Sequence, residues 1–168
     1  MTAGEAALAP TTHGWSFFDR FGYARNVMSE KGRVGFIEPM LALAVTKLPE
    51  GPAWSYELKF DGYRSLGLKK DCKVRILSRN GKDFTKRFAS IAHALEALPD
   101  DTVIDGEVIA YGPDGRPSFN TLQNHRGAGP ELHLYAFDLL MLRGRDLKGE
   151  PLQARREMIA GSPIRKTE

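Results

Sequence analysis

One short stretch of this sequence combines residue types suited to chemistry on a phosphate. Glu57-Leu-Lys59-Phe-Asp61-Gly62-Tyr-Arg64 places a lysine next to an acid, a glycine and an arginine. A lysine amine is protonated in water, with a pKa of about 10.4, and becomes a nucleophile only when it is desolvated or lies beside other cations. Arg64 could supply that charge or hold a phosphate by two parallel hydrogen bonds. Gly62 would let the backbone approach a ligand closely.

The alternative interpretation of this stretch is an ion pair between Lys59 and Asp61 at the end of a strand. A lone Lys-x-Asp would favour that alternative. The whole string, Lys-x-Asp-Gly-x-Arg, fixes four of six positions, so it is more specific than a short glycine motif. The sequence therefore favours a reactive lysine at position 59.

Two further strings add charged side chains to strand-like segments. Ser78–Gly81 puts Arg79 beside a turn, and taken alone it would be a solvated hairpin tip. Ile104–Val108 places Asp105 and Glu107 inside an apolar strand. Buried carboxylates are costly unless they are paired or bind a ligand or metal. A structural salt bridge and a functional site are therefore both compatible with this string.

Short strands are expected to position these residues. The alternation in Ala53–Lys59 predicts a strand with Trp54, Tyr56 and Leu58 on one face. Four more strands are expected, at Arg64–Leu68, Lys73–Leu77, Thr102–Tyr111 and Leu132–Leu140. Within the last of these, Phe137 and Asp138 interrupt an apolar run, and in isolation they would be ordinary core.

Two helices are expected beside these strands. Phe88, Ile91, Leu95 and Leu98 recur at helical spacing, so a helix is predicted over residues 85–98 and ends before Pro99. A second helix is predicted over residues 152–159. The order of strand-rich, helical and strand-rich segments favours an α+β fold with mostly antiparallel sheet.

Composition limits the class of protein. The chain has 168 residues, 42% of them hydrophobic and 27% charged, which is typical of one globular domain. The apolar run Met40–Val45 falls far short of the ~20 residues that span a membrane. A net charge of +3 permits an anionic partner. Cys72 is the only cysteine, and residues 1–6 lack a basic signal-peptide start, so a cytoplasmic location is expected.

Together these strings resemble one family, the adenylation domain of ATP-dependent DNA ligases in the covalent nucleotidyltransferase superfamily. The resemblance is closest to bacterial ligases of the end-joining type and covers about residues 36–160. It is carried by the Lys59 string and by the segments Phe36–Ala42, Ser78–Asp83, Phe119–Gln123, Phe137–Leu140 and Pro151–Arg156. It implies the mostly antiparallel sheets of an ATP-grasp-like nucleotidyltransferase adenylation domain.

The resemblance implies a role for each residue at the nucleotide. Lys59 would attack the α-phosphate of ATP and carry AMP as a phosphoramidate. Glu57 would recognise the adenine base and Phe137 would stack on it, in keeping with the roughly 1–3 kcal/mol that stacking contributes in nucleic-acid sites. Asp61 and Arg64 would organise contacts to the ribose and the nick.

The remaining implied roles concern phosphate and metal. Arg79 would hold a phosphate of ATP or of the nick. Glu107 would bind the ribose and the metal, with ATP and Mg²⁺ as the implied cofactors. Because magnesium takes several oxygen ligands and keeps waters, Glu107 alone is an incomplete metal site.

The sequence also departs from the family. Such ligases have a Glu-Gly string that supplies a metal-directing glutamate and a Lys-x-Lys string that neutralises phosphates, and neither occurs between Leu140 and Glu168. The oligonucleotide-binding (OB-fold) domain that follows in relatives is also missing. We therefore expect residues 36–168 to form a shortened adenylation domain after a tail or lead-in segment at 1–35, with slow or undetectable self-adenylation and no nick sealing by this chain alone.

Two other functions remain open. One is a non-catalytic remnant that binds nucleotide or DNA. The other is an RNA ligase or capping-type nucleotidyltransferase, which shares the Lys-x-Asp-Gly core. Under the ligase interpretation, the expected partners are nicked or broken double-stranded DNA, bound weakly by this chain, and end-joining repair proteins, with no membrane.

Overall fold

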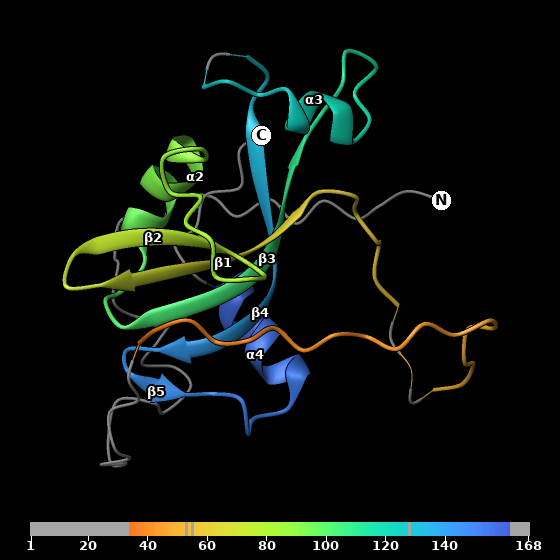
Figure 1. Cartoon of the computed structure of the whole chain (residues 1–168). Coiled ribbons are helices and arrows are strands. Elements are labelled where there is room, and N and C mark those ends of the chain that lie inside the picture. Colours follow the sequence, from red (N-terminus) through yellow and green to blue (C-terminus); the bar gives the residue numbers. More distant parts are fainter. Residues whose placement is uncertain (1–33, 53, 55, 128, 162–168) are drawn as a thin grey trace.

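Antiparallel pairing of neighbouring strands organises the fold (Figure 1). The computed structural model describes residues 34–52, 54, 56–127 and 129–161, so nearly all of the lead-in segment predicted at 1–35 lies outside the described residues. A five-stranded sheet has the order β2-β1-β3-β4-β5. Its strands are β1 (Tyr63–Lys70), β2 (Lys73–Ser78), β3 (Thr102–Ala110), β4 (Leu132–Leu142) and β5 (Arg145–Asp146). The predicted α+β class with antiparallel sheet is confirmed.

Short helices accompany this sheet. They are α2 (Ala89–Ala94), the 3-10 helix η1 (Leu95–Ala97), α3 (Phe119–Gln123) and α4 (Leu152–Ala160). The sequence analysis did not predict α3, although Ser118 is a good helix-starting residue: its hydroxyl accepts the N–H of Thr121 at 3.2 Å. In the described part of the chain, no helix has the length and apolar character needed to cross a bilayer.

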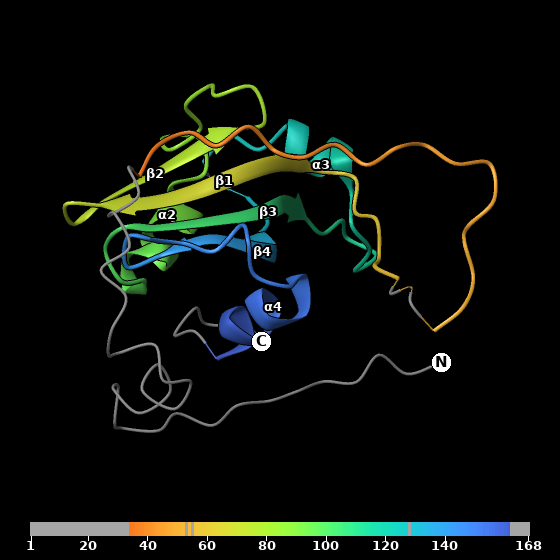
Figure 2. The same cartoon turned by 90° about the horizontal axis from the view of Figure 1, so that it is seen from below.

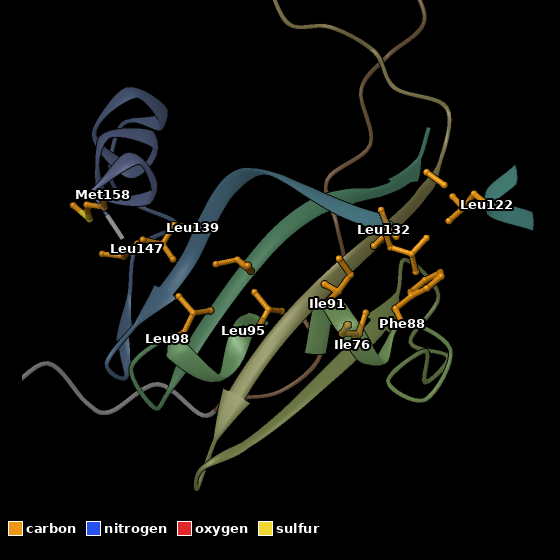
Figure 3. Close-up of a cluster of buried hydrophobic side chains, with 13 residues drawn as sticks. Ile76, Phe88, Ile91, Leu95, Leu98, Leu122, Leu132, Leu139, Leu147 and Met158 are labelled. Atoms are coloured by element: carbon orange, nitrogen blue, oxygen red, sulfur yellow. The ribbon is translucent and has the colours of Figure 1, made fainter. Parts of the chain in front are cut away.

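One face of the sheet carries the larger core. Phe88, Ile91, Leu95 and Leu98, the four residues at helical spacing, are all buried against it. Figure 3 shows this cluster extending along the sheet from Leu122 in α3 to Met158 in α4.

The helix at this face is shorter than predicted. Residues 83–85 instead hydrogen-bond to the edge of β2: the Phe84 N–H donates to the carbonyl of Ile76 at 2.7 Å, and the Thr85 hydroxyl accepts the Ile76 N–H at 3.0 Å. This pairing commits the backbone at Phe84 to the sheet, so the helix begins only at Ala89.

The other face of the sheet carries a smaller core and the start of the described chain. Val34 and Ile37 pack against a buried cluster formed by Leu66, Leu68, Leu77, Val103, Leu140 and Met141. In Figures 1 and 2, the segment that begins at residue 34 first runs along the sheet, then extends away from it and returns to enter β1. This face is therefore covered by an extended segment rather than by a helix.

The strand predicted at residues 53–59 is wrong for the residues described there, Trp54 and 56–59. None of them lies in a strand, and Trp54, Tyr56 and Leu58 are 56%, 59% and 80% exposed. An alternating pattern forms a strand only where a neighbouring backbone accepts its hydrogen bonds and another layer buries its apolar face. The described residues offer neither partner to this segment, so the sheet begins at Tyr63.

A pair of leucine substitutions tests the assignment of the core. Leu95→Ala should lower the free energy of unfolding by about 2–5 kcal/mol, because it empties a fully buried site. Leu43→Ala makes the same change at a residue that is 90% exposed and should have almost no effect. Chemical denaturation of both variants measures the difference, and equal losses would contradict this core.

Candidate active site

A cleft of about 800 Å³ opens where β1 begins, next to the turn that follows β2. Leu41 of the extended segment and Phe119 of α3 form part of its wall. Five of the seven predicted site residues line it: Lys59, Asp61, Arg64, Arg79 and Glu107. Glu57 and Phe137 are not among its lining residues.

Lys59 lies at the mouth of the cleft in an exposed ion pair. Its Nζ is 2.6 Å from Oδ1 of Asp61, and the two side chains are 86% and 81% exposed. The hydrogen bond to Asp61, helped by the attraction between the two charges, raises the pKa of Lys59 above its ordinary value. At neutral pH the amine is therefore protonated, and it must lose a proton before it can act as a nucleophile.

Gly62 brings the lysine segment against β3. Its N–H donates to Oε1 of Glu107 at 3.1 Å. A Cβ at position 62 would lie 2.1 Å from the carbonyl oxygen of Val108, so only glycine fits this approach. Burial raises the pKa of Glu107, while the Gly62 N–H and the nearby Arg64 and Lys59 charges oppose the rise. The motif therefore needs glycine at position 62 for a steric reason.

Arg64 is held by three contacts beneath the cleft. Its Nε and Nη2 donate to the two carboxylate oxygens of Asp105 at 3.2 and 2.8 Å, and its Nη1 donates to the carbonyl of Met40 at 2.8 Å. Asp105 is only 2% exposed. Asp105 therefore forms the structural salt bridge that was one of the two interpretations of its string. The hydrogen bonding to Asp105 raises the pKa of Arg64.

Arg79 lies at the rim in a turn shaped by its neighbours. The Ser78 hydroxyl accepts the N–H groups of Asn80 and Lys82 at 3.3 and 3.0 Å, and Gly81 has a φ of +75°. The Arg79 N–H donates to the Arg64 carbonyl at 3.2 Å. The turn predicted at Asn80-Gly81 is confirmed, and it places a second exposed cation, Lys82, on the same wall.

Glu57 and Phe137 both contact Arg156 of α4. Arg156 of α4 forms an ion pair with Glu57, and its Nε donates to the Phe137 carbonyl at 3.4 Å. Phe137 lies at a bulge between β3 and β4, where the pairing register shifts, and the Arg64 guanidinium lies 5.4 Å from its ring centre. A bulge re-aims a side chain that regular pairing would place otherwise. Arg64 thus contacts Phe137 from the floor of the cleft.

Sequence reasoning missed three residues of this region as site residues. Lys82 and Phe119 line the cleft, and Arg156 connects Glu57 with Phe137. All three lie within segments that carried the family resemblance, which is the signal that could have found them. Among the described residues, no cluster of three or more His, Cys, Asp or Glu side chains could hold a metal ion by itself.

The charge state of Lys59 can be tested by removing its partner. Asp61→Asn should lower the pKa of Lys59 towards its ordinary value, because it removes the charge that stabilises the protonated amine. NMR titration of ¹³C-methylated lysines measures this midpoint. Asp83→Asn is the control, since Asp83 pairs with Arg75 and not with Lys59. A midpoint that stayed in place or rose in Asp61→Asn would show that this ion pair is absent in solution.

Comparison with known proteins agrees with the geometry. The chain is 40% identical over 124 residues to the multifunctional non-homologous end joining protein LigD of Pseudomonas aeruginosa, and the match covers 72% of this chain and 15% of that protein. It is 37% identical over 139 residues to DNA ligase C1 of Mycolicibacterium smegmatis, with 74% and 40% covered. The chain therefore spans less than half the length of these relatives.

A solved structure gives the same result. A mycobacterial DNA ligase D complexed with ATP and MES matches with a TM-score of 0.55 and 39% sequence identity, over 62% of this chain and 35% of that one. Residues 39–162 match the model of the ATP-dependent DNA ligase domain. With the Lys-x-Asp-Gly-x-Arg string gathered at one cleft, the chain belongs to the ATP-dependent DNA ligase domain family.

Proposed function

We propose that this chain carries the nucleotide-attachment site of an ATP-dependent DNA ligase, with Lys59 as the residue that takes up AMP. The observation that carries the proposal is the placement of Lys59, Arg79, Lys82 and Glu107 around one cleft. A cleft of about 800 Å³ is within the range of ordinary small-ligand sites, which run to roughly 300–1,000 Å³. It is large enough for a nucleoside triphosphate.

The proposed reaction is a displacement at the α-phosphorus of ATP. The neutral amine of Lys59 forms a new N–P bond, the bond from phosphorus to the pyrophosphate oxygen breaks, and pyrophosphate leaves with its electron pair. The amine gives up a proton to the surroundings of the cleft. Arg79 and Lys82 are placed to stabilise the phosphate charge that develops during this step.

Leaving Asp61 would also change the state of Lys59. Its ammonium proton is shared with Asp61 in the free chain. Cations disfavour a neighbouring protonated amine, so bringing Lys59 towards Arg79 and Lys82 and away from Asp61 favours the neutral form. We propose that this exchange of partners accompanies the start of the reaction.

The cleft suits a magnesium ion that arrives with ATP. Magnesium is usually held by one or two carboxylates together with phosphate oxygens and waters, and Glu107 offers one half-buried carboxylate. Glu107 would hold the ion, which when bound supplies positive charge to the phosphates. The absence of a three-ligand protein cluster among the described residues is in keeping with an ion carried by its nucleotide.

For the adenine base we keep the roles implied by the resemblance. Glu57 would recognise the base and Phe137 would stack on it, with Asp61 and Arg64 nearer the ribose and the nick. In the free chain Glu57 is paired with Arg156, and Arg64 lies over Phe137. Entry of the base therefore requires Glu57 to exchange its arginine partner for the purine.

The proposed substrate is nicked or broken double-stranded DNA in the cytoplasm. The proposed protein partners are end-joining repair proteins. Two of the similar proteins are named for non-homologous end joining and DNA ligation. These names favour DNA over the RNA ligase or capping-type alternative. The exposed, protonated Lys59 is the observation that favours the second candidate, a site that binds nucleotide or DNA without turnover.

Transfer of AMP to the protein is the direct test. Incubation with radiolabelled ATP and Mg²⁺ followed by denaturing electrophoresis should label the wild-type chain, slowly and without nick sealing. The Lys-x-Lys string that neutralises phosphates in the family does not occur between Leu140 and Glu168, and loss of one charge-stabilising group costs roughly 10²–10³ in rate. Lys59→Ala should abolish the label and Lys70→Ala should retain it, because Lys70 lies at the far end of β1. Label that survives in Lys59→Ala would identify a different nucleophile, and an unlabelled wild type would favour the non-catalytic alternative.

DNA binding should be weak, and its affinity should fall with salt only as much as a few phosphate contacts require. If the exposed Lys59, Arg79 and Lys82 each neutralise one phosphate, the slope of log K against log salt should be about −3, at roughly −0.9 per contact. Fluorescence anisotropy with a nicked duplex measures this slope. Lys82→Ala should reduce its magnitude by about one contact, and Lys148→Ala, on the β5 side of the sheet, serves as the control. Tight binding that ignores salt would contradict the proposed surface.

A further inference from the structure

The segment that carries Lys59 has one partly buried side chain among its described residues. From Glu50 to Asp61, every described residue is exposed except Phe60, which is half-buried. Lys59 and Asp61 on either side of it are free of packing and form only their exposed ion pair. Apart from the ion pair of Glu57 with Arg156, Phe60 is therefore the contact that holds the lysine amine in position.

Phe60 is held by a tyrosine on β4. Its ring stacks on Tyr135, with ring centres 4.4 Å apart and planes tilted by 34°. Tyr135 is the direct cross-strand partner of Glu107, whose carboxylate accepts the Gly62 N–H. The two anchors of the lysine loop, at Phe60 and at Gly62, thus lie on a single cross-strand pair of β3 and β4.

A second tyrosine fixes the first. The hydroxyl groups of Tyr111 and Tyr135 share a hydrogen bond, and the Tyr111 ring packs edge-on against His133 with centres 5.0 Å apart. Burial, together with the bond to Tyr111, raises the pKa of Tyr135 to about 12. Tyr135 therefore keeps its proton, and the link between the hydroxyl groups persists, at neutral pH.

We propose that Tyr135, held in place by Tyr111, is a positioning residue for Lys59: it fixes Phe60 and with it the loop that presents the lysine to the cleft. A nucleophile must be held near its line of attack, and a displacement of about 1 Å can cost as much as a hundredfold in rate. The consequence for rate depends on the proposed function, whereas the anchoring of the loop does not.

Amide hydrogen exchange measures the anchoring without any reaction. In Tyr135→Leu, the Gly62 amide should exchange about threefold to tenfold faster, the change in open population that loss of one aromatic pair allows. Gly67, buried in the middle of β1, should exchange as in the wild type. Tyr135→Phe and Tyr111→Phe each keep the ring and remove only the bond between the two hydroxyl groups, so both should show a smaller increase than Tyr135→Leu.

The rate of Lys59 adenylation is the second measurement. In Tyr135→Leu, the single-turnover rate at saturating ATP should fall about tenfold or more, while the ATP concentration for half-maximal rate stays within about twofold of the wild type. Tyr135→Phe should restore most of the rate. Tyr56→Leu is the matched control: its hydroxyl binds the Pro49 carbonyl and its side chain is exposed, so neither measurement should change.

The outcomes separate the two proposals. Faster exchange at Gly62 alone, larger in Tyr135→Leu than in Tyr135→Phe, supports the positioning role. It does so even if the wild-type chain forms no adenylate, a result that would count only against the proposed function. Unchanged exchange at Gly62 overturns the positioning role. So does an equal rise at Gly67, which would mean that the substitution loosens the whole sheet.

Discussion

The bidentate ion pair between Arg64 and Asp105 is the contact on which the rest of the site depends. It joins β1 to β3 at the point where the sheet faces the cleft, and the third nitrogen of the arginine holds the carbonyl of Met40. Because Asp105 is buried, removing either partner would leave an uncompensated charge, which typically costs about 3–5 kcal/mol. The extended segment, the sheet and the Phe137 ring all meet at this one guanidinium.

This arrangement separates two kinds of charged group. Asp105 is buried and Arg64 half-buried, and the two are paired with each other, whereas Lys59, Arg79 and Lys82 are exposed around the cleft. Buried pairs are rigid because unpairing them is costly, and exposed charges are free to change partners. A site that takes up a polyphosphate needs both: a rigid floor, and cations that can exchange water or a carboxylate for phosphate oxygens.

The contact between α4 and the lysine segment connects the two ends of the matched region. Arg156 bonds Glu57, two residues before Lys59, and also the backbone of Phe137 on β4. Next to it, Arg155 pairs with Asp138, whose pKa is raised by burial despite that partner. Two neighbouring arginines of one helix thus contact β4, and one of them, Arg156, connects Glu57 with the backbone of Phe137 although neither residue lines the cleft.

The sequence by itself determined what depends on local pattern and residue type. The spacing of Phe88, Ile91, Leu95 and Leu98 predicted a buried face, and the Lys59 string predicted a segment that does line the cleft, because these signals lie within short stretches of sequence. Only the tertiary structure decided which partners those residues meet. Residues 54 and 56–59 have a strand pattern but no neighbouring strand among the described residues. Asp105 and Glu107 have the same local pattern, yet Asp105 pairs with Arg64 while Glu107 accepts the Gly62 N–H at the cleft. A carboxylate's role depends on the charge and burial around it, and those are set by strands distant in sequence.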